Sequence, residues 1–190
     1  MKKNYHIILS SNSPRRKELL SGLDIDFDVC VIPSVDEHYP SDLPVMEIAG
    51  YIAAEKAEAY RSMMKPDDLV ITADTVVVVG DKVLGKPKDT DDAVDMLRLI
   101  SGRTHHVVTG VCLTSVEKQK RFSVVTDVTF KALSDDEIRY YVERYKPFDK
   151  AGAYGIQEWI GYIGVTSING SYFNVMGLPV QRIYDELQAF

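Results

Sequence analysis

The sequence predicts an α/β protein in which a mixed β-sheet is flanked by helices. Strand-like apolar segments alternate with helix-like segments along the whole chain. Two expected hairpins place neighbouring strands antiparallel, so the sheet is not all-parallel. The composition, 45% hydrophobic and 26% charged over 190 residues, is typical of a globular chain with one core. We therefore expect a single domain spanning residues 1–190.

The first third of the chain predicts a strand, a helix, a second strand and a longer helix. These segments are residues 5–10, 13–22, 27–32 and 43–64. Ser13 is a typical N-cap and Pro14 a typical first helical residue, while Gly22 ends that helix. In the fourth segment apolar residues recur at helical spacing behind Pro44.

The middle of the chain predicts a central strand, because residues 69–79 are its most β-branched stretch. Gly80 and Asp81 turn this strand into a hairpin with residues 82–84. Thr90 is expected to cap the next helix, which ends at Gly102.

The last part of the chain predicts strands over residues 105–115 and 121–133, joined at a charged turn near Glu117. Ser134 and Glu137 form a capping box that opens a helix. A last strand over residues 160–168 and a last helix over 178–187 follow. The turn near residue 117 is expected to separate two lobes with a cleft between them.

Charge and composition argue against several classes of partner. Lys and Arg number 22 and Asp and Glu 28, which gives a net charge of −6 and no overall basic surface for nucleic acid or an anionic membrane. No apolar stretch approaches the ~18 residues of a membrane span, and no secretory segment is recognisable. Cys30 and Cys112 are expected to be buried, reduced thiols of a cytoplasmic protein. The oligomeric state stays open, a homodimer included.

Residues 10–16 form a small polar loop that runs into a helix start. Exposed N–H groups near Ser11 and Ser13, together with the guanidinium groups of Arg15 and Arg16, suit a phosphate or a carboxylate. The alternative is an ordinary Ser-Pro helix start with solvated arginines.

Asp74 is a carboxylate inside the most apolar strand. A buried charge needs a partner, and such a group is often a metal ligand or a proton acceptor. The alternative is a strand-end aspartate in water. Asp36 and Glu37 are a second acidic candidate.

Two further loops carry candidate chemistry. Gly85-Lys86-Pro87 holds a lysine on a stiff loop, or is an ordinary turn. Residues 149–157 contain glycines that allow close backbone approach, or form a flexible surface loop. His105 and His106 are neighbours in a strand and face opposite sides, so they cannot chelate one ion. Any metal is therefore expected on oxygen ligands, as Mg²⁺ or Mn²⁺.

Taken in order, these motifs resemble the Maf family of nucleoside triphosphate pyrophosphatases. The matching segments are S-x-S-P-R-R at 11–16, D-E at 36–37, E-K-A at 55–57, A-D-T at 73–75, G-K-P at 85–87, S-G-x-T-H at 101–105, D-K-A-G-A-Y-G-I-Q at 149–157 and I-N-G-S-Y…G-L-P at 168–179. The resemblance implies a fold akin to the inosine triphosphate pyrophosphatases: an elongated mixed sheet with helices outside and a cleft between two lobes. It also implies hydrolysis of a nucleoside triphosphate to the monophosphate and pyrophosphate with a divalent cation.

The resemblance also implies roles for single residues. Asp74 falls on the position of the proton acceptor. Arg15, Thr75 and Gln157 fall on the positions that separate the subgroups, and these three residue types match the group that hydrolyses dTTP and UTP. The group resembling 7-methyl-GTP pyrophosphatase carries Trp, Gln and Glu there.

The chemistry of the residues agrees with this interpretation. The cations expected on the phosphates are Arg15, Arg16, Lys56 and Lys86, beside Ser11 and Ser13. Glu37 and Asp74 are the expected ligands of Mg²⁺ or Mn²⁺, and the amide of Gln157 matches the O4 and N3–H edge of thymine or uracil. Two alternatives remain: a non-catalytic nucleotide-binding regulator of cell division, and a pyrophosphatase of purine or modified nucleotides.

Overall fold

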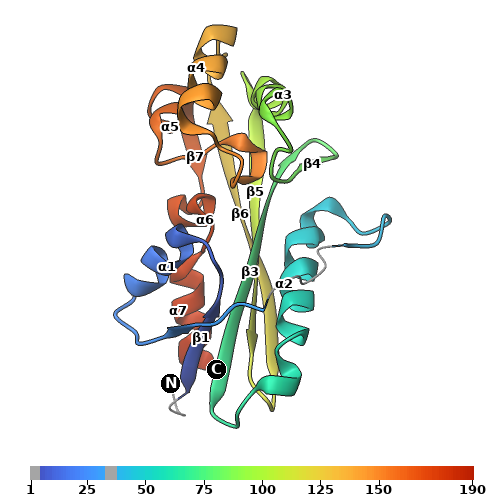
Figure 1. Ribbon diagram of the computed structural model, residues 1–190, viewed down its shortest axis with the longest axis vertical. Coiled ribbons are helices and arrows are strands. Elements are labelled where there is room, and N and C mark those ends of the chain that lie inside the picture. Colours follow the sequence, from blue (N-terminus) through green and yellow to red (C-terminus); the bar gives the residue numbers. More distant parts are fainter. Residues whose placement is uncertain (1–4, 33–37) are drawn as a thin grey trace. The chain divides into compact units, whose positions relative to one another are not determined.

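A computed structural model describes residues 5–32 and 38–190 (Figure 1). Among these residues seven strands form one mixed sheet, in the order β2-β1-β3-β5-β6-β7 with β4 beside β3. The strands are β1 (His6–Ser10), β2 (Asp28–Val29), β3 (Asp68–Val79), β4 (Lys82–Leu84), β5 (Thr104–Thr114), β6 (Gln119–Phe130) and β7 (Val165–Asn169). The pairs β1–β2 and β1–β3 are parallel, whereas β3–β4 and β6–β7 are antiparallel. The predicted mixed α/β fold is confirmed.

Helices precede, link and follow these strands. The α-helices are α1 (Pro14–Ser21), α2 (Ile48–Glu58), α3 (Thr90–Ile100), α4 (Asp135–Tyr145), α5 (Trp159–Gly164), α6 (Tyr172–Met176) and α7 (Val180–Ala189). Short 3₁₀ turns lie at Val45–Glu47, Arg61–Met63 and Ala151–Ala153. The predicted caps hold for α1, where the Ser13 side chain accepts from the Arg16 amide, and for α4, which has the full capping box of Ser134 and Glu137. No helix among the described residues is both long and apolar enough to cross a membrane.

The chain divides into two compact units. Unit 1 takes Met1–Asp74, Thr109–Val124 and Gly177–Phe190, apart from the residues that are not described. Unit 2 takes Thr75–Val108 and Val125–Met176. The strands β3, β5 and β6 each contribute residues to both units. The lobe boundary near residue 117 and the cleft stay predictions.

In unit 1, helix α2 packs against strands through small residues. Ala53 and Ala57 are fully buried and cluster with Cys112 of β5. A Cβ added at Gly110 of β5 would lie 2.3 Å from the backbone of Ala49, so only glycine permits this approach. The backbone of α2 therefore lies in direct contact with the backbone of β5.

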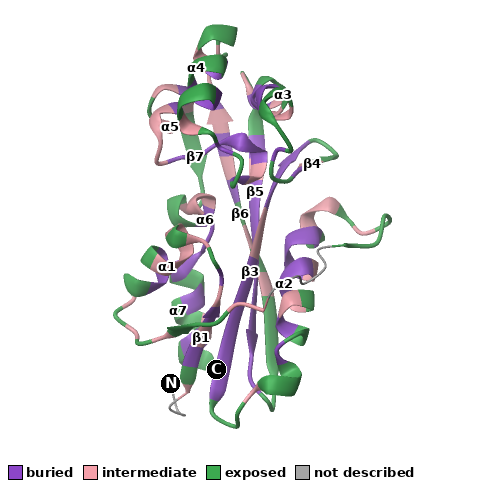
Figure 2. Cartoon of the chain, in the orientation of Figure 1, coloured by how far each residue is buried: buried purple, intermediate pink, exposed green. Residues whose placement is uncertain are grey.

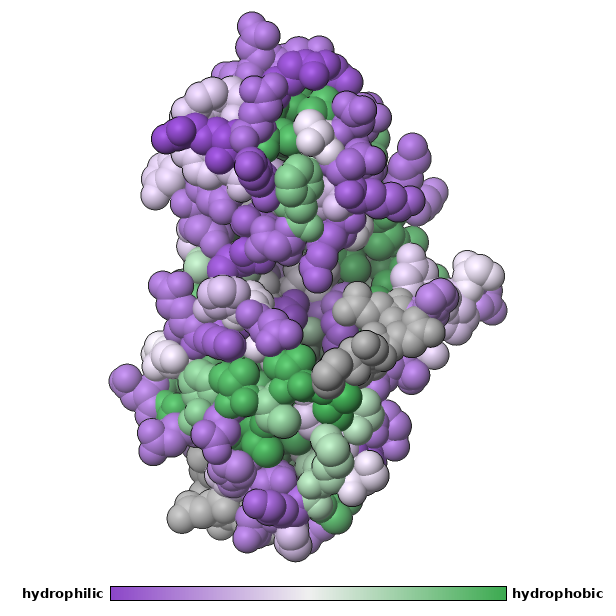
Figure 3. Space-filling view, viewed as in Figure 1, coloured by the Kyte–Doolittle hydropathy of each residue, from purple (hydrophilic) through white to green (hydrophobic). Residues whose placement is uncertain are grey.

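Unit 2 has an apolar core between its strands and the helices α3 and α4. Leu97, Phe130, Ile138 and Tyr154 are among its buried members. Figure 2 shows buried positions on α3, on α4 and along β3. Figure 3 shows that the visible surface over α3 and α4 is largely hydrophilic, as expected for amphipathic helices with acidic first turns.

Several local expectations differ from the structure. The helix expected over residues 43–64 is shorter, because α2 covers only Ile48–Glu58. Residues 160–164 form α5, not a strand, because a short apolar run does not distinguish the two structures until its packing partners are known. Asp89, not Thr90, caps α3, since its side chain accepts from the amide of Asp92. The strand expected over residues 27–32 shrinks to β2, whose two residues are exposed, and Cys30 beside it is exposed rather than buried. Helix α6 was not anticipated.

Candidate active site

Asp74 and Thr75 interrupt an otherwise buried strand. Along β3, all of whose residues are described, burial lapses at these two positions alone (Figure 2). The Nζ atom of Lys56 on α2 lies 2.7 Å from Oδ1 of Asp74, and the two side chains are only 17% and 15% exposed. The carboxylate therefore has the charged partner that its place in an apolar strand requires.

Helix α2 presents Lys56 to Asp74 because a second contact fixes it on β3. The hydroxyl of Thr72 donates to the carbonyl of Ala53 over 2.6 Å, in a buried site. Thr72 and Asp74 are two residues apart and share one face of the strand. Ala53 and Lys56 are three residues apart and share one face of the helix. The hydrogen bond from Thr72 to Ala53 and the ion pair of Asp74 with Lys56 therefore join β3 to α2 at neighbouring positions.

The polar loop before α1 is tied to the same strand. The Ser11 hydroxyl accepts from the Ser13 amide at 3.2 Å, and the Ser13 hydroxyl caps α1. Arg16 donates from Nη1 to the carbonyl of Ala73 and from Nε to the carbonyl of Gly177, both at 2.8 Å. Arg15, in the first turn of α1, is half-buried. Unit 1 thus holds this loop beside the residue that precedes Asp74.

Tyr60 makes polar contacts in unit 1 that no sequence motif indicated. Its hydroxyl accepts from Ser10 at 2.7 Å and from the Ile32 amide at 2.9 Å, and donates to the Cys30 carbonyl at 2.8 Å. It links the end of β1 to the segment that leads towards residues 33–37. Its place on the apolar face of a helical pattern gave no sign of this polar role.

The loop of residues 149–157 and the loop of residues 85–87 contact each other within unit 2. The amide of Gly152 donates to the carbonyl of Gly85 over 3.0 Å. Gly152 has a φ of +68°, and a Cβ there would lie 2.8 Å from Cγ2 of Val77. The glycine therefore serves close backbone approach, as the sequence indicated.

Gln157 and Lys86 also belong to unit 2. The Oε1 atom of half-buried Gln157 is buried and has no hydrogen-bond partner among the described residues. A buried acceptor without a partner costs about 1–3 kcal/mol, so a donor that reached this atom would be stabilising. Lys86 is exposed and lines a pocket of about 480 Å³ formed by β4, its following loop and α3.

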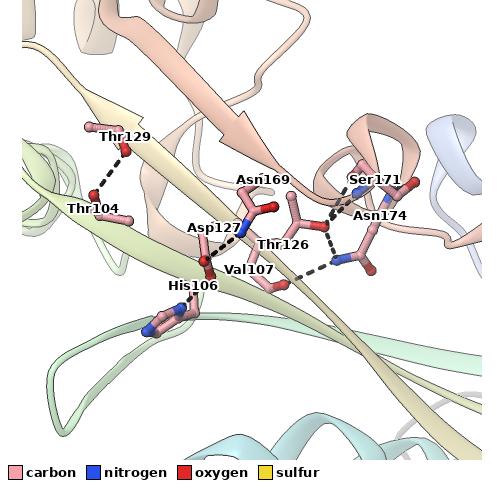
Figure 4. A network of polar contacts seen from close by, with 9 residues as sticks. All are labelled: Thr104, His106, Val107, Thr126, Asp127, Thr129, Asn169, Ser171 and Asn174. Carbon is pink, nitrogen blue, oxygen red and sulfur yellow. Dashed lines mark hydrogen bonds and ion pairs between the residues drawn. The ribbon is translucent and has the colours of Figure 1, made fainter.

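The two neighbouring histidines have different surroundings, as their opposite directions predicted. His105 is fully buried, lies 2.7 Å from the Tyr154 hydroxyl through Nε2, and has its pKa lowered to about 4 by burial. His106 is partly exposed and pairs with Asp127 at 2.7 Å (Figure 4). Asp127 also accepts from Asn169 at 3.4 Å, which ties β5, β6 and β7 together.

A second part of the network in Figure 4 fastens α6 to the sheet. The side-chain amide of Asn174 donates to Thr126 Oγ1 and to the carbonyl of Val107, at 3.0 and 3.1 Å. Thr126 also exchanges hydrogen bonds with the backbone of Ser171. These residues are structural supports of unit 2.

The expected metal ligands are described only in part. Glu37 lies outside the described residues, as does Asp36. Within residues 5–32 and 38–190 no three His, Cys, Asp or Glu side chains gather as a metal site. Of the other candidates, Ser11, Ser13, Arg15, Arg16, Lys56 and Asp74 lie in unit 1, and Thr75, Lys86 and Gln157 lie in unit 2. Asp74 is the last residue of its segment in unit 1, and Thr75, the next residue, is the first residue of unit 2.

Comparison with known proteins gives one consistent family. The family profile described as "Maf-like protein" matches residues 6–190. A dTTP/UTP pyrophosphatase of Bacteroides thetaiotaomicron is 61% identical over 184 residues, which cover 97% of this chain and 95% of the relative. One of Phocaeicola vulgatus is 63% identical with the same coverage. The solved Ham1 protein of Staphylococcus aureus is similar in fold, with a TM-score of 0.57, 17% identity and coverage of 97% and 98% of the two chains.

Proposed function

This chain belongs to the family of Maf-like proteins, and from that premise we propose that it hydrolyses dTTP and UTP to the monophosphate and pyrophosphate. Relatives at 56–63% identity over nearly the whole chain bear the name dTTP/UTP pyrophosphatase. The observation that carries the proposal is the Lys56–Asp74 pair, set at the one lapse of burial along the fully described strand β3.

Asp74 is the proposed proton acceptor. Water attacks the α-phosphorus, and the carboxylate takes the proton that the attacking water loses. The bond from the α-phosphorus to the bridging oxygen breaks, and pyrophosphate leaves. Lys56 holds the carboxylate in one orientation, and Thr72 fixes the helix from which Lys56 extends.

The chain also offers groups for the phosphates. Arg15, Lys56 and Lys86 supply positive charge against a substrate that carries about four negative charges, despite the net charge of −6. The loop that holds Ser11 and Ser13 adds hydroxyls and amides at a helix start. Two donors of Arg16 are used on backbone carbonyls, so Arg16 both shapes this loop and brings its charge there.

A divalent cation, Mg²⁺ or Mn²⁺, is the proposed cofactor. Asp74 offers a hard oxygen ligand in a partly exposed position, and Mg²⁺ commonly uses one or two carboxylates with substrate phosphates. Asp74 is therefore suited to such an ion, and Glu37 is the second proposed ligand. When bound, the ion neutralises charge on the phosphoryl group and makes water more acidic.

Gln157 is the proposed reader of the base, with Arg15 and Thr75 as further specificity residues. Its Oε1, without a partner among the described residues, would accept the N3–H of uracil or thymine, and its amide would donate to O4. Cytosine presents an amino group and a bare N3, which is the reverse pattern. UTP should therefore be preferred over CTP by roughly ten- to a hundredfold for each mispaired group.

A hydrolysis panel tests the proposal. Pyrophosphate and monophosphate release would be measured for dTTP, UTP, CTP, ATP and GTP with Mg²⁺ or Mn²⁺. We expect the highest kcat/KM for dTTP and UTP. Binding without turnover would favour the non-catalytic regulator, and a purine preference would favour the other pyrophosphatase class. A cytoplasmic location, the lack of a nucleic-acid partner and a homodimer stay predictions.

A further inference from the structure

A buried tyrosine outside the predicted motifs holds the loop that carries Gln157. Tyr141 of α4 is fully buried, and its hydroxyl accepts from the amide of Gly155 at 3.0 Å. The same hydroxyl donates to Oε2 of Glu158. Gly155 and Glu158 lie two residues before and one residue after Gln157. One oxygen atom therefore fixes the chain on both sides of the proposed base-reading residue.

The carboxylate of Glu158 is held from a second side. Nζ of the buried Lys150 lies 3.1 Å from Oε1 of Glu158 and 2.8 Å from Oδ1 of Asp149. Glu158 precedes α5 in the N-cap position, yet among the described residues its side chain caps no amide. Its carboxylate instead turns to Tyr141 and Lys150. Two side-chain contacts therefore hold a carboxylate that α5 does not use as a cap.

The packing leaves little freedom at this point. A Cβ added at Gly155 would lie 2.9 Å from Cδ of Glu158 and 3.1 Å from Cε of Lys150. Burial, and then the hydrogen bond to the Glu158 carboxylate, raises the pKa of Tyr141 well above its ordinary value. The phenol is therefore protonated at any working pH and remains a donor to Glu158. The hydroxyl, the carboxylate and the ammonium form a fixed set, which we call the Tyr141 clamp.

We propose that the Tyr141 clamp, formed by Tyr141, Glu158 and Lys150, determines base specificity by fixing the backbone from which the Gln157 side chain extends towards a uracil or thymine edge. This inference rests on the proposed function, in which Gln157 reads the base. A Gln157 whose backbone could shift would meet either pyrimidine with its donor or its acceptor. A backbone held on both sides limits the direction from which the side chain reaches the base, and the arrangement with a donor for O4 rejects cytosine. The three clamp residues are positioning residues, because they act on the base through Gln157.

The test compares Tyr141→Phe with Tyr140→Phe. Both changes remove one phenolic hydroxyl from neighbouring residues of α4, but Tyr140 is 47% exposed and contacts Trp159 through its ring, which phenylalanine keeps. The ratio of kcat/KM for UTP to kcat/KM for CTP should fall about tenfold or more in Tyr141→Phe, as expected when a buried polar contact is lost. It should stay within about twofold of the wild type in Tyr140→Phe. The thermal unfolding midpoint of each variant is measured alongside.

A second variant covers the case in which Tyr141→Phe does not fold. Glu158→Gln keeps an acceptor for the Tyr141 hydroxyl but removes the charge that binds Lys150. The UTP/CTP ratio should fall in this variant too, with kcat for UTP reduced less than the ratio. A purely structural role would lower activity on both nucleotides equally and leave the ratio unchanged.

The outcomes separate this inference from the proposed function. A wild-type chain that hydrolyses UTP and CTP equally overturns the base reading by Gln157, and the clamp falls with it. A wild-type chain that prefers UTP, with the same ratio in the folded variants, overturns the clamp alone. A reduced ratio in Tyr141→Phe or Glu158→Gln, but not in Tyr140→Phe, supports it.

Discussion

At the level of single residues, the proposed activity depends most on the ion pair of Lys56 and Asp74. Both side chains are more than four-fifths buried, and their charged atoms are 2.7 Å apart. A buried pair of this kind is costly to break, because removing one partner leaves the other charge without compensation. A substitution that tests the role of Asp74 must therefore keep the shape of the side chain and change only its charge.

Asp74→Asn is expected to abolish most turnover and, because it leaves the Lys56 charge without its partner, to lower stability without changing the fold. Removing a general base typically costs ~10²–10⁴ in rate, and the amide retains the size of the carboxylate. Steady-state hydrolysis of dTTP and UTP is the measurement, with far-UV circular dichroism as a check on folding.

Asp81→Asn is the matched control. Asp81 is an exposed residue of the turn between β3 and β4, so the same change there should leave activity close to that of the wild type. If Asp74→Asn retained more than about a tenth of the wild-type rate, Asp74 would not be the proton acceptor.

At the level of elements, the contact between α2 and β5 depends on one glycine. Gly110→Ala would place a methyl group 2.3 Å from the backbone of Ala49, and neither backbone can move without disturbing the helix that carries Lys56. Overpacking of a core usually costs about 1–3 kcal/mol, and a backbone clash lies at the upper end. Urea unfolding should show this loss, accompanied by a reduced kcat.

Gly85→Ala provides the comparison for stability. Nothing lies within 4 Å of a Cβ at Gly85, so its free energy of unfolding should change by less than about 0.5 kcal/mol. Equal stability of the two variants would show that α2 can shift without cost.

A histidine joins the strands β1, β2 and β3 at one end of their pairing in unit 1. His6 Nδ1 lies 2.9 Å from Asp68, and its Nε2 lies 2.7 Å from Asp28. Hydrogen bonds to Asp68 and then to Asp28 raise the pKa of His6 above 6.5. Burial acts to raise the pKa of Asp68, but the hydrogen bonds from His6 and from the Lys65 amide outweigh it, and the pKa lies below 3.8.

His6→Gln should therefore change the pH dependence of stability. The contribution of a group with a raised pKa is complete below the unfolded value of 6.5 and is lost as the pH rises through the folded pKa. The contribution of Asp68 is present above 3.8 and is lost as the pH falls through its folded pKa. The difference in unfolding midpoint between wild type and His6→Gln should be largest between these limits and should shrink at alkaline pH. A difference that is constant from pH 5 to pH 9 would contradict the charged bridge.

At the scale of the whole molecule, the proposed metal ligands Glu37 and Asp74 come from segments far apart in sequence. Chelation of divalent ions with EDTA should stop hydrolysis, and Mg²⁺ or Mn²⁺ should restore it, because hard oxygen ligands favour these ions. Zn²⁺ serves as a comparison, since it prefers nitrogen and sulfur ligands. Full activity after exhaustive chelation would remove the cation from the proposed mechanism.

Much of the fold follows from local sequence. The capping box at Ser134 depends on residues three apart, and the turn at Gly80 depends on two neighbours, so both could be predicted without knowing the rest of the chain. The β-branched content of β3 likewise marks an interior strand, which its place between β1 and β5 confirms. The motifs around Ser11, Asp74 and Gln157 were visible for the same reason, because each lies within a few residues.

The remaining features were decided by tertiary structure, because they depend on residues that are distant in sequence. Nothing local pairs Lys56 with Asp74, places Tyr60 among three backbone and side-chain partners, or brings Tyr141 to Glu158. The short apolar run over residues 160–164 is compatible with a strand or a helix, and only its tertiary packing makes it the helix α5. By itself the sequence determined the elements, the family resemblance and the chemical types of the site. The long-range packing decided which side chains meet, since a hydrogen bond or an ion pair is specified by position in space and not by spacing along the chain.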